Sequence, residues 1–256
     1  MLRAITHKVS PHINNCELTY LNRTPIDVEL AARQHDAYCA VLERLGVTVE
    51  RLSENESYPD ACFVEDTAIV AGELVVICCL GVSSRRGETG LIERVLSKHK
   101  KTVRISLPAT IEGGDVLQMG EKIFAGQSCR TNSQGIDELA RILKPHGYSV
   151  TPVRTKGSLH LKSACTAIDD ETLFVNPEWV DLTPLKEFNL VYTPAEEPWS
   201  ANVLRVGETV CIQAGFPAAA ELIERLARRV EIVDMSELRK AEAALTCSSI
   251  IFESAL

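Results

Sequence analysis

Residues 115–126 read DVLQMGEKIFAG, two apolar runs separated by the turn Gly120-Glu121. A short glycine-containing turn between two such runs is typical of a tight β-hairpin. The next stretch, TNSQGIDELARILKPHG (131–147), has the apolar spacing of an amphipathic helix, and YSVTPV (148–153) is rich in β-branched residues. The sequence therefore predicts a unit of strand, strand, helix and strand.

The same unit recurs along the chain. Three more hairpins are expected, at TAIVAGELVVICCL (67–80), ACTAIDDETLFV (164–175) and NVLRVGETVCIQ (202–213). Helical patterns followed by strands cover 85–107, 181–194 and 217–235, and residues 25–52 supply a long helix and a strand. Equivalent positions are separated by 49, 50, 36 and 46 residues, at Asp66, Asp115, Cys165, Ala201 and Cys247. Five units therefore fill the chain.

Five such units that close into a ring leave a central channel lined by the first strand of each unit. We predict an α/β fold with a five-bladed ββαβ propeller, formed by residues 1–256 as a single domain. A small ligand is expected in the channel. The openings of the first strands then form the functional surface, namely FVEDT, IEGGD, LHLKS, SANVL and LTCSS.

Composition excludes several classes of protein. The net charge of −8 argues against nucleic acid, which usually requires a basic patch, and mildly favours a cationic small molecule. The longest apolar run, residues 74–80, is too short to cross a membrane, and residues 1–12 lack the apolar stretch of a secretion signal. Nine cysteines without CxxC spacing predict reduced thiols rather than disulfides or structural zinc. A cytoplasmic protein is expected.

Three residues could form a nucleophilic centre. Cys247 opens the last predicted strand, and a thiol becomes a nucleophile when a neighbouring group stabilises its thiolate. His160 is the one histidine at an equivalent strand position, and Glu112 precedes two glycines that permit close backbone approach. The alternatives are a buried core histidine and a solvated glutamate in a turn.

Further charged residues surround the same strand openings. Asp60, Glu65 and Asp66 flank an apolar stretch, so at least one carboxylate is expected to face the channel. Arg85 and Arg130 precede the helices of successive units, where two guanidinium groups could bind a carboxylate. Solvated loops would also explain these residues.

Six motifs carry a family resemblance. They are YPDACFVEDT (58–67), SSRRGET (83–89), IEGGD (111–115), CRTN (129–132), LHLKS (159–163) and LTCSS (245–249). Their order resembles that of the dimethylarginine dimethylaminohydrolases, members of the guanidino-group-modifying (amidinotransferase, or pentein) superfamily, and the whole chain is similar to that family. The resemblance implies a five-bladed propeller without metal or organic cofactor. It also implies hydrolysis of NG-methylated arginine, above all asymmetric dimethylarginine, to citrulline and dimethylamine through a cysteine-bound thiouronium.

The resemblance also implies roles for the site residues. Cys247 would be the nucleophile, His160 the general acid and base, and Glu112 the carboxylate that orients the histidine. The substrate-binding set would comprise Asp66 with Glu65 at the guanidinium, Asp60 with the backbone of Leu18 at the α-amino group, Arg85 with Arg130 at the α-carboxylate, and the backbone oxygen of Ala241. Ala241 stands where the family usually carries a larger aliphatic residue.

Three other functions stay open from the sequence. The first is another guanidine reaction in the same fold, as in an arginine deiminase or an amidinotransferase. The second is a non-catalytic binding module, and the third is a cysteine peptidase. A homodimer is the candidate assembly, and residues 14–22 are expected to form a lid over the channel.

Overall fold

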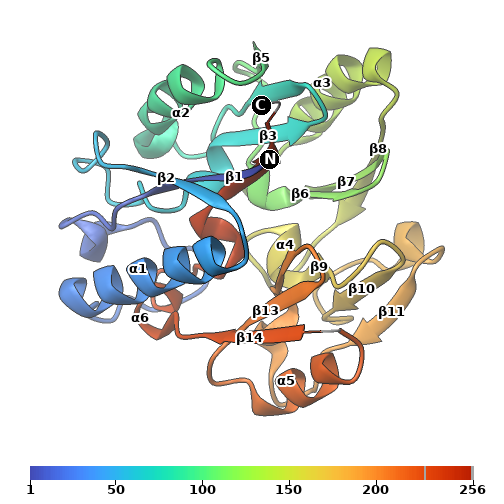
Figure 1. Ribbon diagram of the computed structural model, residues 1–256. Coiled ribbons are helices and arrows are strands. Elements are labelled where there is room, and N and C mark those ends of the chain that lie inside the picture. Colours follow the sequence, from blue (N-terminus) through green and yellow to red (C-terminus); the bar gives the residue numbers. More distant parts are fainter. Residues whose placement is uncertain (228, 255–256) are drawn as a thin grey trace.

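The computed structural model describes residues 1–227 and 229–254. Over these residues the strands form five separate three-stranded sheets (Figure 1). The blades along the chain are β3 (Ala68–Ala71), β4 (Leu74–Ile77) and β5 (Lys101–Arg104); β6 (Val116–Met119), β7 (Lys122–Gln127) and β8 (Ser149–Arg154); β9 (Cys165–Ala167), β10 (Thr172–Val175) and β11 (Asn189–Tyr192); β12 (Leu204–Val206), β13 (Thr209–Gln213) and β14 (Arg229–Val233); and β15 (Ile250–Glu253), β1 (Leu2–His7) and β2 (Thr48–Leu52).

Each blade has the same internal order. The first strand pairs antiparallel with the second, and the second pairs parallel with the third. In the last blade the first strand is the carboxyl-terminal β15, which pairs with the amino-terminal β1, so the two ends of the chain close the ring. The chain therefore folds as the predicted five-bladed α/β propeller.

The burial of the strands explains their sequences. The second strands β4, β10 and β13 are buried along their whole length, and they read as continuous apolar runs because they are covered on both faces. The third strands β5 and β11 have exposed ends. Among the first strands, β15 contacts β3, β6 contacts β9, and β9 contacts β12. The first strands consequently face the centre of the ring.

One long helix packs on most of the blades, where it connects the second strand to the third. The helices are α1 (Val28–Arg44), α2 (Thr89–Leu96), α3 (Ser133–Leu143) and α5 (Pro217–Glu224), with the shorter α4 (Leu161–Ala164) and α6 (Ser236–Arg239). The Asn132 side chain caps α3 by accepting the N–H of Gly135 at 2.8 Å. Leu139 and Leu143 of α3 are fully buried against Ile123 of β7, and each buried leucine contributes about 1.5–3 kcal/mol.

The structure corrects four details of the sequence-based prediction. Cys247 lies in a 3-10 turn (Thr246–Ser248) before β15, and His160 precedes the one-turn helix α4, so neither residue is in a strand. Residues 181–188 contain a single 3-10 turn at Thr183–Leu185 instead of a helix. The last long helix ends at Glu224, well before residue 229. Strand β1 was not predicted. In the described part of the chain, no helix is both long and apolar enough to span a membrane.

Candidate active site

A short helical turn precedes the first strand of every blade, and these turns meet at one end of the channel. They are Val64–Thr67 before β3, Gly113–Asp115 before β6, α4 before β9, Pro198–Ala201 before β12 and Thr246–Ser248 before β15. The first turn contacts the second and the fifth, and α4 contacts the second and the fourth. Residues far apart in the sequence are thereby brought to one place because they occupy equivalent positions in the repeat.

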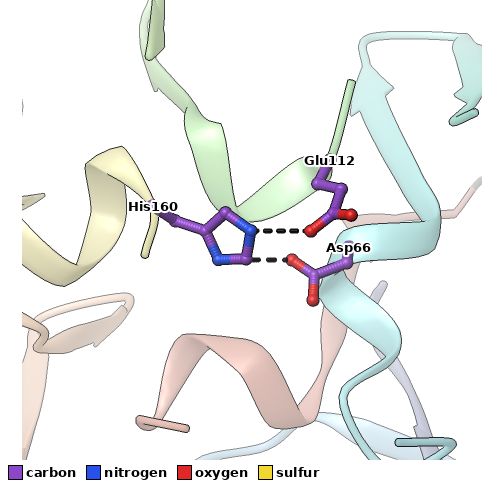
Figure 2. A group of neighbouring side chains, drawn as sticks. All are labelled: Asp66, Glu112 and His160. Atoms are coloured by element: carbon purple, nitrogen blue, oxygen red, sulfur yellow. Dashed lines mark hydrogen bonds and ion pairs between the residues drawn. The ribbon is translucent and has the colours of Figure 1, made fainter. Parts of the chain in front are cut away.

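His160 and Glu112 form a buried pair in this region. His160 Nε2 lies 2.7 Å from Glu112 Oε2, and the two residues are 3% and 0% exposed (Figure 2). The other carboxylate oxygen, Oε1, accepts the backbone N–H of Gly81 at 3.0 Å, and the Glu112 N–H is held by Thr131 Oγ1. The carboxylate is thus fixed on both oxygens and holds the imidazole in one orientation.

Asp66 lies beside Glu112 on the same side of the imidazole (Figure 2), with 3.8 Å between its Oδ1 and His160 Nδ1. Its Oδ2 accepts a hydrogen bond from Arg85 Nη1 at 2.7 Å, and Oδ1 also accepts the Gly114 N–H at 3.2 Å. A Cβ at Gly114 would lie 2.6 Å from His160 Nδ1 and 2.8 Å from Asp66 Oδ1. Glycine is therefore required here for the backbone to approach both side chains.

These carboxylates keep the buried imidazole charged. Burial alone lowers the pKa of His160, but the carboxylates of Asp66 and Asp115 and the hydrogen bond to Glu112 outweigh it and raise the pKa to about 9. For Asp66, burial alone would raise the pKa, but the positive charges of His160 and Arg85 prevail and lower it. His160 is consequently an imidazolium at neutral pH and can donate a proton.

Cys247 shares a cavity with this charged group. Cys247 as a whole residue is partly exposed, and its sulfur accepts the Ala244 N–H at 3.5 Å. Burial, and then the negative charges of Glu65 and Asp66, raise the pKa of the Cys247 thiol above its ordinary value. The thiol is therefore protonated at neutral pH.

The cavity has a volume of about 20 Å³. The residues that line it are Glu17, Asp60, Phe63, Asp66, Arg85, Arg130, Leu159, His160, Ala241, Glu242, Ala243 and Cys247. Seven of the residues singled out from the sequence thus surround one space, and Glu112 lies directly behind His160.

The polar groups at the outer end of the cavity already have partners. Both Asp60 oxygens accept the Glu17 N–H at 3.2 Å. Arg130 Nη2 donates to Thr19 Oγ1 at 3.2 Å, and its Nη1 lies 3.8 Å from Glu112 Oε1. The Arg85 guanidinium, besides Asp66, binds the Glu88 carboxylate and the Phe63 carbonyl. Burial raises the pKa of Glu88 to about 7 although Arg85 opposes this.

Glu65 lies elsewhere. Its carboxylate binds Lys162 Nζ at 2.5 Å and accepts the Thr246 hydroxyl at 2.7 Å. It lines two cavities with Leu117 and Ile251, and it is not among the described residues around the cavity of Cys247. A contact between Glu65 and the substrate stays a prediction.

Leu18 and Ala241 lie close to the cavity. Leu18 is half-buried and packs against the apolar cluster that contains Ala241 and Leu245. Ala241 is 4% exposed and lines the cavity. Leu18 is not among the lining residues, but its neighbour Glu17 is. The role of the Leu18 backbone stays a prediction.

Sequence reasoning missed several residues in or beside the site, among them Glu17, Asp115, Lys162 and Glu242. Asp115 Oδ1 accepts the Leu161 N–H at 2.9 Å and so fixes the backbone next to His160. Lys162 pairs with Glu65, and Glu242 lines the cavity. Two of these could have been found, because Asp115 and Lys162 lie within the IEGGD and LHLKS motifs.

Asp66, Glu112 and His160 are also near enough to share a metal ion, with donor atoms within 4.8 Å of one another. Their donor atoms are already engaged with each other, with Gly81 and with Arg85. Two guanidinium groups lie against the same carboxylates, which disfavours a further cation. The cluster fits an ion-pair network that supports the imidazolium better than it fits a metal centre.

Comparison with known proteins gives a consistent result. Residues 10–192 match the family described as "N,N dimethylarginine dimethylhydrolase, eukaryotic". The chain is 36% identical to N(G),N(G)-dimethylarginine dimethylaminohydrolase of Pseudomonas aeruginosa over 228 residues, which cover 88% of this chain and 90% of the relative. A solved structure of the Pseudomonas aeruginosa enzyme, a cysteine-to-serine mutant complexed with citrulline, superposes with a TM-score of 0.94 at 34% identity and covers 98% of both chains.

A second solved structure, of a dimethylarginine dimethylaminohydrolase adduct with S-methyl-L-thiocitrulline, gives a TM-score of 0.93 at 34% identity and covers 98% of this chain and 99% of the other. The family match spans well over half of the chain, and the fold and the motif order agree with it. The chain belongs to the dimethylarginine dimethylaminohydrolase family.

Proposed function

We propose that this protein hydrolyses asymmetric dimethylarginine to citrulline and dimethylamine, with Cys247 as the nucleophile. The observation that carries the proposal is the placement of the Cys247 thiol in one cavity with an imidazolium, His160, that is held by buried carboxylates. The relatives support the substrate class, since one was solved with citrulline and another as an adduct with S-methyl-L-thiocitrulline.

The charges of the cavity suit a guanidinium substrate. Burial, and then the negative charges of Glu65 and Asp66, raise the pKa of the Cys247 thiol, so a positive charge placed beside the sulfur would lower this pKa again and favour the thiolate. A bound guanidinium provides this charge at the carbon that the sulfur attacks. The substrate would then assist in forming its own nucleophile, and a neutral ligand would leave the thiol protonated.

The reaction then needs one proton donor and one water molecule. The Cys247 thiol gives up its proton to solvent, and the thiolate attacks the central guanidinium carbon and forms a C–S bond while the C=N π electrons move onto nitrogen. His160 gives its proton to the alkylated nitrogen, the C–N bond breaks, and dimethylamine leaves a thiouronium on the sulfur. His160, now neutral, takes a proton from a water molecule that attacks the same carbon. The C–S bond breaks, the hydroxyl proton of the adduct passes to the sulfur, and citrulline is released with Cys247 again present as the thiol.

The outer end of the cavity fits the amino-acid part of the substrate. Asp60, an acceptor already bound to a backbone N–H, suits an α-amino group. Arg130 suits the α-carboxylate. Its guanidinium lies near Glu112 and Thr19, and it has further N–H donors that could bind a carboxylate. Arg85 would assist from its place beside Asp66. Agmatine, which lacks the carboxylate, is expected to be a poor substrate.

Steady-state kinetics on arginine, its methylated forms and agmatine test the proposal. We expect the highest kcat/KM for asymmetric dimethylarginine, with dimethylamine and citrulline formed in equal amounts. A higher kcat/KM for free arginine with release of ammonia would instead identify an arginine deiminase. Transfer of the amidino group to an added amine would identify an amidinotransferase.

We also propose that the protein works in the cytoplasm. All nine cysteines are free in the structure, and six of them are buried without a partner thiol. Reduced thiols of this kind suit a reducing compartment.

A further inference from the structure

Glu242 has an unusual backbone conformation in the wall of the cavity. Its φ of +58° makes it the one non-glycine residue with positive φ in the described part of the chain. L-residues rarely adopt this conformation, and where they do so beside a site it is held by surrounding contacts. The contacts of Glu242 therefore indicate what this conformation serves.

The Glu242 carboxylate binds three successive backbone N–H groups of a distant segment. Its Oε1 accepts from Thr19 at 3.0 Å, from Tyr20 at 2.5 Å and from Leu21 at 2.5 Å, and Oε2 also accepts from Thr19 at 3.0 Å. Successive N–H groups that converge on a carboxylate form strong, charge-assisted hydrogen bonds. We call this arrangement the clasp.

The segment held by the clasp contacts the expected substrate-binding groups. Glu17 donates its N–H to Asp60, and the Thr19 hydroxyl accepts from Arg130. The side chains of Thr19 and Tyr20 are exposed, so apolar packing contributes little to holding this part of the segment. The clasp consequently has a large share in keeping residues 17–21 next to Asp60 and Arg130.

The clasp also closes the cavity of Cys247. The volume of about 20 Å³ has room for about one water molecule, so an arginine derivative cannot enter without movement of the wall. A second cavity of about 230 Å³ lies on the other side of Glu242 and Ala243, and Leu21 lines it as well. Opening the clasp would separate these walls and join the two spaces.

We propose that Glu242 is a positioning residue that holds residues 17–21 over the substrate cavity, so that its loss weakens substrate capture far more than bond cleavage. The inference rests on the proposed function for its kinetic consequence. The structural consequence, a loss of protection of the Thr19, Tyr20 and Leu21 amides, is independent of any activity.

Two variants separate the clasp from the backbone conformation. Glu242→Gly removes the carboxylate but suits the positive φ, whereas Glu242→Ala removes the carboxylate and leaves a side chain in a strained backbone. Glu237→Gln is the matched control, because Glu237 also accepts an N–H of the amino-terminal region, that of Asp27 at 2.8 Å, but does not line the cavity.

The experiment measures KM and kcat for asymmetric dimethylarginine, together with amide hydrogen exchange over residues 17–23. For Glu242→Gly we expect KM to rise about tenfold and kcat to stay within about twofold of the wild-type value. The reason is that the lost charged hydrogen bonds act in substrate capture and not in bond cleavage. Exchange of the Thr19–Leu21 amides should become faster in Glu242→Gly and Glu242→Ala. Glu237→Gln should match wild type in both.

Wild-type KM and wild-type amide exchange in Glu242→Gly would overturn the proposal and reduce Glu242 to a turn residue. The same conclusion would follow if Glu242→Ala lost both kcat and folding stability and Glu242→Gly restored both to the wild-type values. Glu242 would then matter only for its backbone conformation. If the wild-type protein does not hydrolyse dimethylarginine, the proposed function fails, and the exchange measurement still decides whether the clasp exists.

Discussion

His160 Nε2 lies 2.7 Å from Glu112 Oε2, and Asp66 lies on the same side of the ring, with 3.8 Å between His160 Nδ1 and Asp66 Oδ1. The negative charges of these carboxylates and of Asp115 outweigh the effect of burial and stabilise the imidazolium, which raises the pKa of His160 to about 9. This relationship assigns His160 the role of proton donor to the leaving amine, and it sets the pH range in which the donor is available.

Glu112→Gln should therefore change the pH dependence of the reaction. The wild-type kcat is expected to fall as the pH rises through about 9, because His160 then loses the proton that the amine requires. Removing the Glu112 charge lowers the pKa of His160, so this fall should begin at a lower pH, with kcat reduced about tenfold or more at neutral pH. The check is kcat measured from pH 6 to 10, with the exposed Glu121→Gln as control. An unshifted alkaline limb would contradict the role of Glu112.

Gly114→Ala should impair the site through steric contact alone. The added Cβ would lie 2.6 Å from His160 Nδ1 and 2.8 Å from Asp66 Oδ1, so the imidazole must move away from its position. We expect kcat to fall about 100-fold, because displacing a catalytic group by about 1 Å can reduce the rate by this factor. Gly90→Ala, which meets nothing within 4 Å in α2, should keep full activity. Equal activity of the two variants would show that the close approach at Gly114 is not needed.

Arg130→Gln should weaken binding of substrates that carry an α-carboxylate. A hydrogen bond to a charged group is worth about 1.5–3 kcal/mol, so KM for asymmetric dimethylarginine should rise about tenfold or more. Dimethylated agmatine, which has no carboxylate, should be hydrolysed equally by wild type and variant. The exposed Arg141→Gln is the control. A similar loss on both substrates would place Arg130 away from the carboxylate.

The repeat was readable from the sequence because each blade is a local unit with its own hairpin and helix. It predicted the five sheets, and it predicted that the openings of the first strands converge. It could not show that Cys247 lies in a short helical turn and that His160 directly precedes one, because turns of three or four residues carry too few positions for a periodic signal. Strand β1 was not predicted because its antiparallel partner β15 lies at the other end of the chain, so the two strands do not form a local hairpin.

The ion pairs around the site could not be predicted from the sequence either. Residue type and order predicted that Arg85 and Asp66 belong to the site, but not that they form an ion pair at 2.7 Å. They also did not predict the ion pair between Glu65 and Lys162. Such pairings depend on side-chain directions, within one blade for Arg85 and Asp66 and between blades for Glu65 and Lys162, and a repeat does not specify these directions. The assembly as a homodimer and the single domain over residues 1–256 stay predictions, which sedimentation and cooperative unfolding can test.

Lys162→Met should destabilise the fold. The Glu65 carboxylate is buried, and burial raises its pKa even though the charge of Lys162 lowers it. Removing Lys162 leaves that carboxylate without its partner, at a cost of about 3–5 kcal/mol, and Glu65→Gln combined with Lys162→Met should recover most of the loss. Urea unfolding measures both, with the exposed Lys122→Met as control. A double variant as unstable as Lys162→Met would show that the pair is not the cause.

The central claim is that Cys247 carries the substrate carbon during turnover. Its most direct test is acid quenching of the wild-type protein during hydrolysis of asymmetric dimethylarginine, followed by peptide mass analysis of all nine cysteines. The account predicts a thiouronium adduct, lacking dimethylamine, on the peptide that contains Cys247, and its absence from Cys247→Ser. Release of dimethylamine without such an adduct, or an adduct on another cysteine, would contradict it.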